Sequence, residues 1–342
     1  MQANRNRDGF TLVELLTVIA IITLLIGILV PALSSSRDQA KKVRTRAQLQ
    51  AIETGNQMFQ GDNDAFPASS GLNPFQDATA NIPLSGAQWI SLQLAGFDQG
   101  GYVSPTVGSD YDNNRLIDHN DWRDWYGLTP AREYGRLGPY IEVDGSTLRS
   151  PERFLQDNTN VEPPDALMLD PAGDDFSSGR IPFFVDSFNQ PILYYRANAK
   201  VRTPFTTGTR GSSFDIGKYD HSDNALFTGA DEANGLYADV IGTKDGWDVS
   251  GRGSLPVPGA GVGLHPIGVF GYDAANPNKW PEPGTFGAYM SDRNVFDTTY
   301  RPGSDGGQIV PYKPDRFVLI SAGKDGLYGT SDDVRNFEPS TK

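Results

Sequence analysis

The longest apolar run of the chain lies near its N-terminus. Residues 10–30 read FTLVELLTVIAIITLLIGILV, and Glu14 is the only charged residue among these 21 positions. At a rise of 1.5 Å per residue, a helix of this length crosses a bilayer core of about 30 Å. Arg5 and Arg7 precede the run, and a basic flank favours the cytoplasmic side of a membrane. The pattern predicts one membrane-spanning helix with a cytoplasmic N-terminus and an exported remainder.

Apolar residues continue at helical spacing beyond this segment. In residues 32–60 they recur at steps of three and four, at Ala40, Val43, Ala47, Ala51, Ile52, Gly55 and Phe59. This spacing predicts the amphipathic half of one long helix. Pro31 stands at the junction with the transmembrane half, residues 10–31. A proline breaks the interior of a soluble helix but a membrane helix absorbs it as a kink, so we expect a kink there and no helix stop.

Basic residues gather in the amphipathic half. They are Arg37, Lys41, Lys42, Arg44 and Arg46. From the sequence alone they form a solvated face that meets lipid headgroups, and no specific ligand is assigned to them.

The residues around the start of the apolar run form a cleavage motif. Residues 9–14 read GFTLVE, and no small-residue cleavage site follows the run. The segment resembles the prepilin cleavage motif of type IV pilins and type II secretion pseudopilins. The resemblance implies that a prepilin peptidase removes residues 1–9 by cutting after Gly9, and that it methylates the new terminal amine of Phe10.

Glu14 is costly inside a membrane segment and is therefore a functional candidate. The resemblance implies that it pairs with the terminal amine of a neighbouring subunit during filament assembly. The alternative is an interfacial carboxylate that snorkels to the headgroups.

Three segments of residues 61–342, the exported globular domain, extend the resemblance. GDNDAFP at 61–67 is a turn cluster that ends the helix, and it resembles the segment that leaves the long helix in the major pseudopilin. IPFFVDSFNQPILYY at 181–195 predicts a strand, a turn and a strand, and FVLI at 317–320 predicts a short buried strand. The resemblance implies an α+β, pilin-like fold in which the N-terminal helix packs on an antiparallel sheet.

Two long stretches separate the matched segments, at about 72–180 and 197–316. Both are rich in Gly, Pro, Asp and Asn, and neither shows a clear internal repeat. They have no counterpart in the compact pseudopilins. We expect elaborated loops with short strands and turns, inserted into one pilin-like core.

The C-terminal segment contains a candidate calcium loop. Asp325, Asp332 and Asp333 lie close together in the sequence among three glycines, and hard oxygen ligands in a flexible loop suit Ca²⁺. The stretch resembles the C-terminal calcium loop of the major pseudopilin. That resemblance implies Asp325 and Asp332 as ligands and leaves Asp333 open between ligand and cap. The alternative is a solvated acidic turn.

Residues 110–121 form a second candidate calcium loop with EF-hand-like spacing. Its oxygen side chains are those of Asp110, Asp112, Asn114, Asp118 and Asp121. Arg115 occupies the position that needs a glycine, which opposes this assignment because positive φ is costly for a residue with a Cβ. Calcium and an acidic surface turn both stay open here. We expect the adjacent aromatic residues, Trp122, Trp125 and Tyr126, to pack locally.

Composition excludes several other functions. The chain of 342 residues has 29 basic and 42 acidic residues, a net charge of −13, no cysteine and three histidines. The acidic balance argues against nucleic-acid binding. The absence of cysteine excludes disulfides and thiolate metal sites. No zinc-protease, nucleophile-elbow or phosphate-loop motif is present, so we expect a protein that is not an enzyme and does not itself power assembly.

These patterns predict a structural pseudopilin of a type II secretion filament, stabilised by calcium. The resemblance implies three kinds of partner: a prepilin peptidase, an assembly ATPase with its inner-membrane platform, and other pseudopilins, both copies of the chain and minor subunits. It places the chain in the inner membrane, with a single pass and a periplasmic C-terminal domain. A surface type IV pilin stays open, as does a membrane-anchored binding or hydrolytic protein that uses a pilin-like export helix.

Overall fold

The computed structural model describes most of the chain. The described residues are 12–76, 83–104, 117–127, 136–144, 147–159, 176–206, 217–228, 265–301 and 306–338. The predictions for Gly9, Phe10, Asp110, Asp112 and Asn114 lie outside these residues. The chain divides into two compact units, residues 1–44 and residues 45–342.

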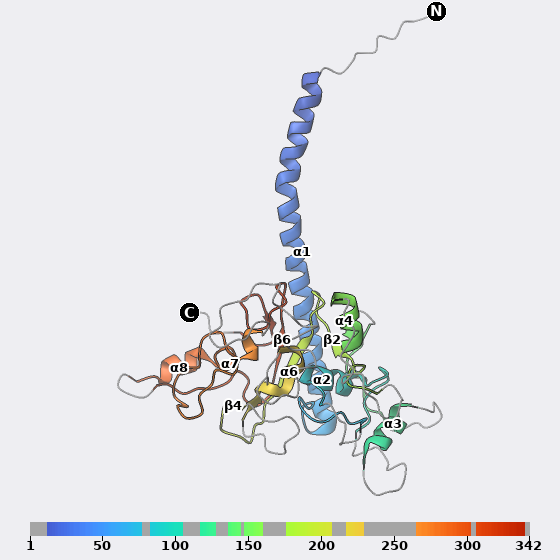
Figure 1. Ribbon diagram of the computed structural model, residues 1–342, viewed down its shortest axis with the longest axis vertical. Helices are drawn as coiled ribbons and strands as arrows, with labels where there is room; N and C mark the ends of the chain where they lie inside the picture. The colour runs from blue at the N-terminus through green and yellow to red at the C-terminus, as the bar shows by residue number, and fades with distance from the viewer. Residues whose placement is uncertain are drawn as a thin grey trace, which may run out of the picture. The chain divides into compact units, whose positions relative to one another are not determined.

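Helix α1 spans Leu12–Asn63 without interruption (Figure 1). It runs through Pro31, and the hydroxyl of Ser34 donates a hydrogen bond of 2.9 Å to the Pro31 carbonyl. A helix stop at this proline is therefore excluded, while a kink there stays a prediction. Helix α1 also continues slightly beyond the predicted end at residue 60.

The first part of α1 is suited to lipid. It is long and apolar enough to cross a membrane, and no residue of its most hydrophobic window is buried. Its threonine hydroxyls bond back to the helix: Thr17 donates to the Val13 carbonyl at 3.1 Å, and Thr23 donates to the Ile19 carbonyl at 2.9 Å. These polar groups are therefore satisfied without water, as a lipid environment requires.

The second part of α1 carries two different apolar faces. Ile52, Gly55 and Phe59 are buried in the globular unit. The other residues that the sequence assigned to the same face are exposed, namely Ala40, Val43, Ala47 and Ala51. The prediction of a single face was wrong, because the step from Ala51 to Ile52 is one residue and turns the helix by about 100°. The exposed set is apolar and lies outside the globular core.

A three-stranded antiparallel sheet is the centre of the globular unit. It has the order β3 (Ile192–Arg196), β6 (Phe317–Ser321) and β7 (Val334–Arg335). In its register Ile192 lies opposite Ser321, and Ile320 lies opposite Arg335. The predicted strand at 317–320 and the second apolar run of 181–195 are confirmed. The sheet joins strands from two matched segments that are far apart in the sequence.

The first apolar run of segment 181–195 does not form a simple hairpin with the second. Strand β2 (Phe183–Phe184) pairs with β1 (Leu148–Arg149), and only one bridge, between Val185 and Pro191, joins it to the start of β3. The first insertion thus supplies the partner strand of β2.

The sheet is buried on both faces, and strand alternation separates two cores. Tyr194 and Leu319 face a core that contains Leu49, Ile52 and Phe59 of α1. The strand residues next to these, such as Tyr195 and Val318, face a second core on the other side of the sheet. Much of this second core comes from the second insertion. Its members include Tyr195, Val318, Ile320, Phe205, Phe227, Phe286 and Met290. The second insertion therefore covers the sheet face opposite to α1.

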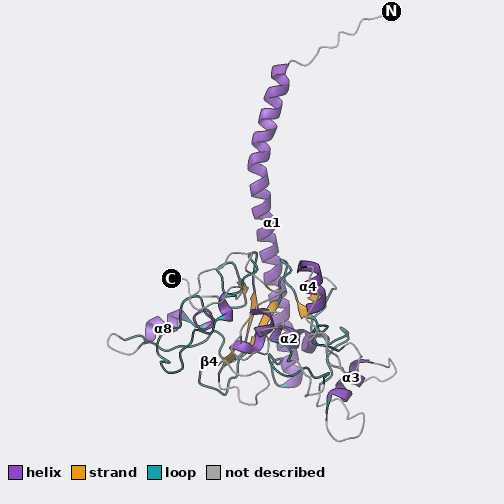
Figure 2. Ribbon diagram, in the orientation of Figure 1, coloured by secondary structure: helices purple, strands orange, loops and turns teal. Residues whose placement is uncertain are grey.

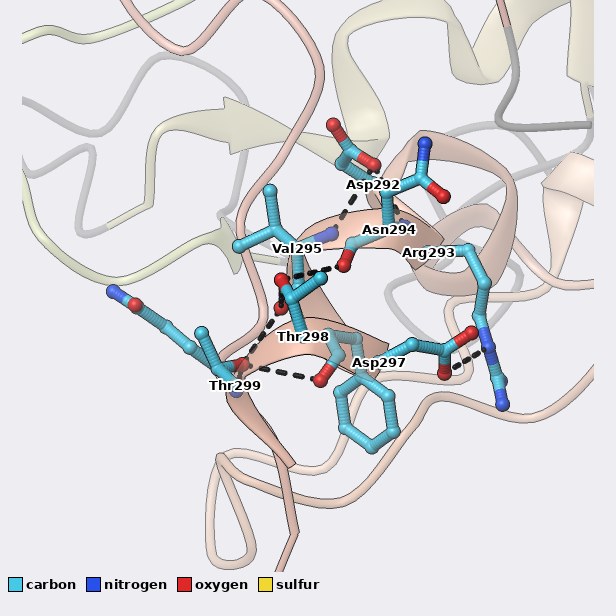
Figure 3. A network of polar contacts seen from close by, with 9 residues as sticks. Asp292, Arg293, Asn294, Val295, Asp297, Thr298 and Thr299 are labelled. Carbon is cyan, nitrogen blue, oxygen red and sulfur yellow. Dashed lines mark hydrogen bonds and ion pairs between the residues drawn. The ribbon is translucent and has the colours of Figure 1, made fainter. Parts of the chain in front are cut away.

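The insertions contain several helices, which corrects the expectation of loops with short strands (Figure 2). Their elements are α2 (Gly86–Ala95), α3 (His119–Gly127), α4 (Pro151–Thr159), β4 (Phe205–Thr206), β5 (Tyr219–Asp220), η2 (His221–Asn224), α6 (Ala225–Thr228), η5 (Pro266–Gly268), α7 (Phe286–Met290) and α8 (Arg293–Thr299). Strands β4 and β5 pair in parallel. At the start of α8 the Asp292 carboxylate accepts from the Asn294 amide at 2.9 Å, and Arg293 pairs with Asp297 at 2.9 Å (Figure 3).

Helix α2 is the best-packed element of the first insertion. All of its residues are buried, and a capping box joins Ser85 and Gln88 at its start. Asn224 links the helix to the sheet, because its side chain accepts from the Ala87 amide at 3.0 Å and donates to the Tyr194 carbonyl at 2.8 Å. A Cβ on Gly86 would lie 2.1 Å from that same Tyr194 oxygen. Only glycine allows this approach of helix and strand.

Replacement of Gly86 by alanine should therefore destabilise the globular unit. The added methyl group forces α2 away from β3, and overpacking of this kind costs about 1–3 kcal/mol. Thermal denaturation of the soluble fragment from Ser34 onward measures the effect. Gly61→Ala is the matched control, since a Cβ at Gly61 meets nothing within 4 Å. Equal melting temperatures for the two variants would contradict the close contact.

Candidate functional site

The loop between β6 and β7 holds the candidate calcium residues. The loop leaves β6 after Ser321 and returns at Val334, and these two residues pair across the sheet. Gly323 has a φ of +65°, and a Cβ there would lie 2.5 Å from the Asp332 carbonyl oxygen. The glycine thus lets the two ends of the loop approach each other.

Asp325 and Asp332 lie next to each other in this loop. One Asp332 carboxylate oxygen accepts from the backbone amides of Lys324 at 2.8 Å and Asp325 at 3.2 Å, and the other accepts from the Thr330 hydroxyl at 2.7 Å. An Asp325 oxygen accepts from the Leu327 amide at 2.8 Å. The loop therefore brings two carboxylates into one small volume.

The electrostatics of the pair reflect this arrangement. Partial burial, followed by the proximity of Asp332, raises the pKa of Asp325 above its ordinary value. Partial burial also opposes ionisation of Asp332, but the hydrogen bonds from Thr330 and the backbone outweigh it and lower the pKa of Asp332. Asp332 is thus held as a carboxylate while Asp325 resists ionisation beside it, a conflict that a cation between them would relieve.

Asp333 lies beside this pair, because the Thr330 hydroxyl that contacts Asp332 also contacts an Asp333 carboxylate oxygen at 3.2 Å. It accepts hydrogen bonds from the Gly329 amide at 2.8 Å and from the Tyr289 hydroxyl. The Arg335 guanidinium lies 4.7 Å from the centre of the Tyr289 ring. Burial raises the pKa of Asp333 to about 7. Its contacts are those of a residue that joins the loop to α7.

Two acidic side chains are fewer than a complete calcium site. Among the residues described, no three His, Cys, Asp or Glu side chains are arranged to hold a metal. Ca²⁺ takes six to eight oxygen ligands and accepts backbone carbonyls and waters beside carboxylates. Asp325 and Asp332 fit the chemistry of that ion but supply only part of its shell. Calcium at this loop stays a prediction.

The described part of the second candidate loop forms the start of a helix. Asp118 accepts from the Asn120 amide at 2.8 Å, and the Asp118 amide donates to the Asp121 carboxylate at 2.9 Å. Both residues thus stabilise the first turn of α3. The expected local packing of the adjacent aromatic residues is confirmed, because Trp122, Trp125 and Tyr126 are all buried.

Asp186 has a structural role that the sequence analysis did not assign. It is buried in the turn before β3 and accepts from the amides of Phe188 at 2.7 Å and Gln190 at 2.8 Å. It also accepts from the hydroxyl of Ser321, the last residue of β6. An aspartate at the start of a turn is a visible sequence signal, but its contact with Ser321 depends on the tertiary fold.

The two histidines of the described core are packing residues. Burial lowers the pKa of His221 to about 4, and its Nε2 lies 3.0 Å from the Ile267 carbonyl oxygen. His265 accepts from the Tyr328 amide through Nδ1 at 3.2 Å. The His221 contact lies within the second insertion, and the His265 contact joins that insertion to the C-terminal loop, so both histidines have structural contacts.

Glu14 lies in the first turn of α1, on an exposed part of the helix. A carboxylate at this end of a helix interacts favourably with the helix dipole. The predicted cleavage site precedes the described residues.

The sequence resembles known proteins in two ways. Residues 4–30 match the family described as the prokaryotic N-terminal methylation motif. The type II secretion system core protein G of Escherichia coli is 27% identical over 144 residues, which are 42% of this chain and 93% of the relative. The protein of the same name from Dickeya chrysanthemi is 32% identical over 134 residues, or 39% of this chain and 74% of the relative.

A pilus protein shows a higher identity. The type IV wide pilus major component PilA4 of Thermus thermophilus is 40% identical over 128 residues, which are 37% of this chain and 86% of the relative. No solved structure matches the chain. The three matches cover most of each relative but less than half of this chain, in agreement with its large insertions.

The half-buried Asp333 should make the globular unit less stable as the pH rises. With a pKa of about 7 when folded and about 3.9 when unfolded, it binds more protons in the folded state between these values. Stability contributed by its protonated form is present below pH 4 and is lost as the pH rises through 7. In chelator, Asp333→Asn should flatten the fall in melting temperature between pH 5 and 8. An unchanged slope would contradict the assignment.

Proposed function

Since the chain belongs to the family of type IV pilin-like proteins and type II secretion pseudopilins, we propose that it is a structural subunit of a type II secretion filament. The observation that carries this proposal is α1. Its first part exposes a membrane-length apolar surface, and its second part is packed on an antiparallel sheet. A helix with such a surface needs lipid or other helices around it. A filament built from copies of the chain supplies those helices.

Processing precedes assembly in this proposal. A prepilin peptidase cleaves after Gly9 and methylates the amine of Phe10, which leaves the helix as a single-pass anchor in the inner membrane with the globular domain in the periplasm. An assembly ATPase with its membrane platform then moves the subunit into the filament. Glu14 contributes by pairing with the terminal amine of a neighbouring subunit, because a carboxylate within the membrane is costly and is a functional candidate.

A calcium ion stabilises the end of the globular domain in this proposal, held by Asp325 and Asp332. The support is the pair of adjacent carboxylates in a glycine-rich loop. The bound ion supplies positive charge between them. The chain's own contribution is the position of the carboxylates, which the Lys324 and Leu327 amides and the Thr330 hydroxyl maintain.

A surface type IV pilus is the second candidate assembly. The observation that favours it is the 40% identity to the wide pilus component of Thermus thermophilus. Both assemblies use the same helix, so they differ in location rather than in subunit architecture. Immunogold labelling of intact cells separates them, since a surface pilus is labelled outside the cell and a secretion filament is confined to the envelope.

Glu14→Ala should allow membrane insertion and prevent filament formation. Removal of the carboxylate makes the apolar segment easier to insert, but leaves the amine of the neighbouring subunit without a partner. Membrane fractionation and electron microscopy of sheared filaments measure the two effects. N-terminal sequencing should find Phe10 first in both proteins. Normal filaments from the variant would support the snorkelling alternative, and a mature protein that begins at Met1 would contradict the processing step.

Millimolar Ca²⁺ should raise the melting temperature of the fragment from Ser34 onward. A ligand at a hundredfold excess over its Kd adds about 2.7 kcal/mol to stability, and Mg²⁺ should substitute poorly because it requires a smaller octahedral site. Asp325→Asn should remove the calcium shift. In chelator this variant should be at least as stable as the wild type, because the neighbouring Asp332 no longer faces a second carboxylate.

Two further variants identify the site. Asp273→Asn changes an exposed carboxylate elsewhere in the globular unit and should keep the calcium shift. Asp112→Ala should remove the shift only if the second candidate loop is the principal site. An equal melting temperature of the wild type in Ca²⁺, Mg²⁺ and chelator would exclude both loops.

A further inference from the structure

A cationic stripe lies on α1 beyond the membrane segment. Arg37, Lys41 and Arg44 are separated by four and three residues, so they share one face of the helix. All three side chains are exposed. Lys42 and Arg46 lie on the opposite side, at about 140° and 180° from Arg37, since each residue turns the helix by about 100°.

The outer end of this stripe is too far from the membrane to meet lipid headgroups. At a rise of 1.5 Å per residue, Arg37 is about 10 Å beyond Val30 along the helix and Arg44 is about 21 Å beyond it. The headgroup layer on each side of the hydrocarbon core is only about 5–8 Å thick. Arg37 can therefore reach the headgroups with its long side chain, whereas Arg44 cannot.

Membrane topology does not account for these charges either. Basic residues close to a membrane segment favour the cytoplasmic side. Five basic residues follow the segment here, but only Arg5 and Arg7 precede it. The stripe thus opposes the orientation that exports the globular domain.

The globular domain carries the complementary charge. Residues 60–342 contain 22 basic and 38 acidic residues, a net charge of −16. Many of the acidic side chains are exposed, among them Asp62, Asp64, Asp98, Asp273 and Asp315. Copies of such a domain repel one another when they are brought close together. An assembly of copies is therefore more stable if each copy also presents positive charge to its neighbours.

We propose that Arg37, Lys41 and Arg44 bind the acidic surface of the globular domain of a second copy of this chain. The contact rests on the proposed function, because it forms only when copies assemble. It offsets the repulsion between domains and adds an electrostatic contact outside the membrane to the apolar contacts of the helices. Since the charges are exposed to solvent, salt weakens the contact.

A pair of double variants with the same change in net charge tests the stripe. Arg37→Gln with Arg44→Gln removes two charges from it, and Lys42→Gln with Arg46→Gln removes two from the opposite side. In the full-length protein, the first double variant should lower the filament yield at 0.1 M salt several-fold, up to about tenfold. The second should change it by less than twofold. Equal yields from the two double variants would overturn the proposal.

Cross-linking identifies the bound surface. Filaments are formed from a mixture of copies with natural nitrogen and copies labelled with ¹⁵N, and a carbodiimide joins lysine amines to adjacent carboxylates. Lys41 should be joined to acidic residues of the globular domain in peptides that combine one labelled and one unlabelled partner. Lys41→Arg should remove these cross-links and leave the filament yield unchanged, because it keeps the charge.

The outcomes also separate this inference from the proposed function. Filaments that depend on Glu14 but lack mixed-isotope cross-links from Lys41 would overturn the inference alone. The double variant of Arg37 and Arg44 should lose the same share of its filament yield in anionic and in zwitterionic membranes. A loss that occurs only with anionic lipid would indicate a lipid partner and would also overturn the inference. No filaments under any condition would overturn the proposed function, and the inference with it.

Discussion

Strand β6 lies between two cores, and the rest of the globular unit depends on its burial. All five of its residues, Phe317–Ser321, are buried. Its backbone pairs with β3 along its whole length and with β7 at Ile320 and Ser321, and the Leu319 amide donates to the Asn336 side chain at 2.9 Å. One face contacts the core that contains residues of α1, and the other contacts the core built largely by the second insertion. The candidate calcium loop begins where this strand ends.

The sequence predicted those elements that carry a strong local signal. Helix α1 and β6 were predicted because an apolar run of membrane length and a short apolar run before a glycine-rich loop are recognisable without tertiary contacts. Helix α2 was missed, although Ser85 and Gln88 form a visible capping box. All of its residues are buried, including the polar Gln88 and Gln93, so its polar positions do not mark a water-exposed face and the segment shows no helical period. Local pattern identifies a face in contact with water, and α2 has none.

The candidate site was predictable to the same extent. The proximity of Asp325 and Asp332 follows from a short loop with glycines, and the structure has these residues adjacent. Asp333 also accepts from the hydroxyl of Tyr289, which lies in α7 and is distant in sequence. No spacing rule identifies that contact. The division of the apolar residues of α1 into a buried and an exposed face likewise depends on where the globular core meets the helix.

The insertions change the charge of the chain more than its central architecture. They enlarge both cores around the same short sheet, and residues 60–342 carry a net charge of −16. A larger acidic domain increases the repulsion between neighbouring copies, while the apolar part of α1 stays the same length. The additional repulsion must then be offset outside the membrane. The exposed basic residues of α1 occupy the region between the membrane segment and the globular core, where they can supply that charge without entering either apolar environment.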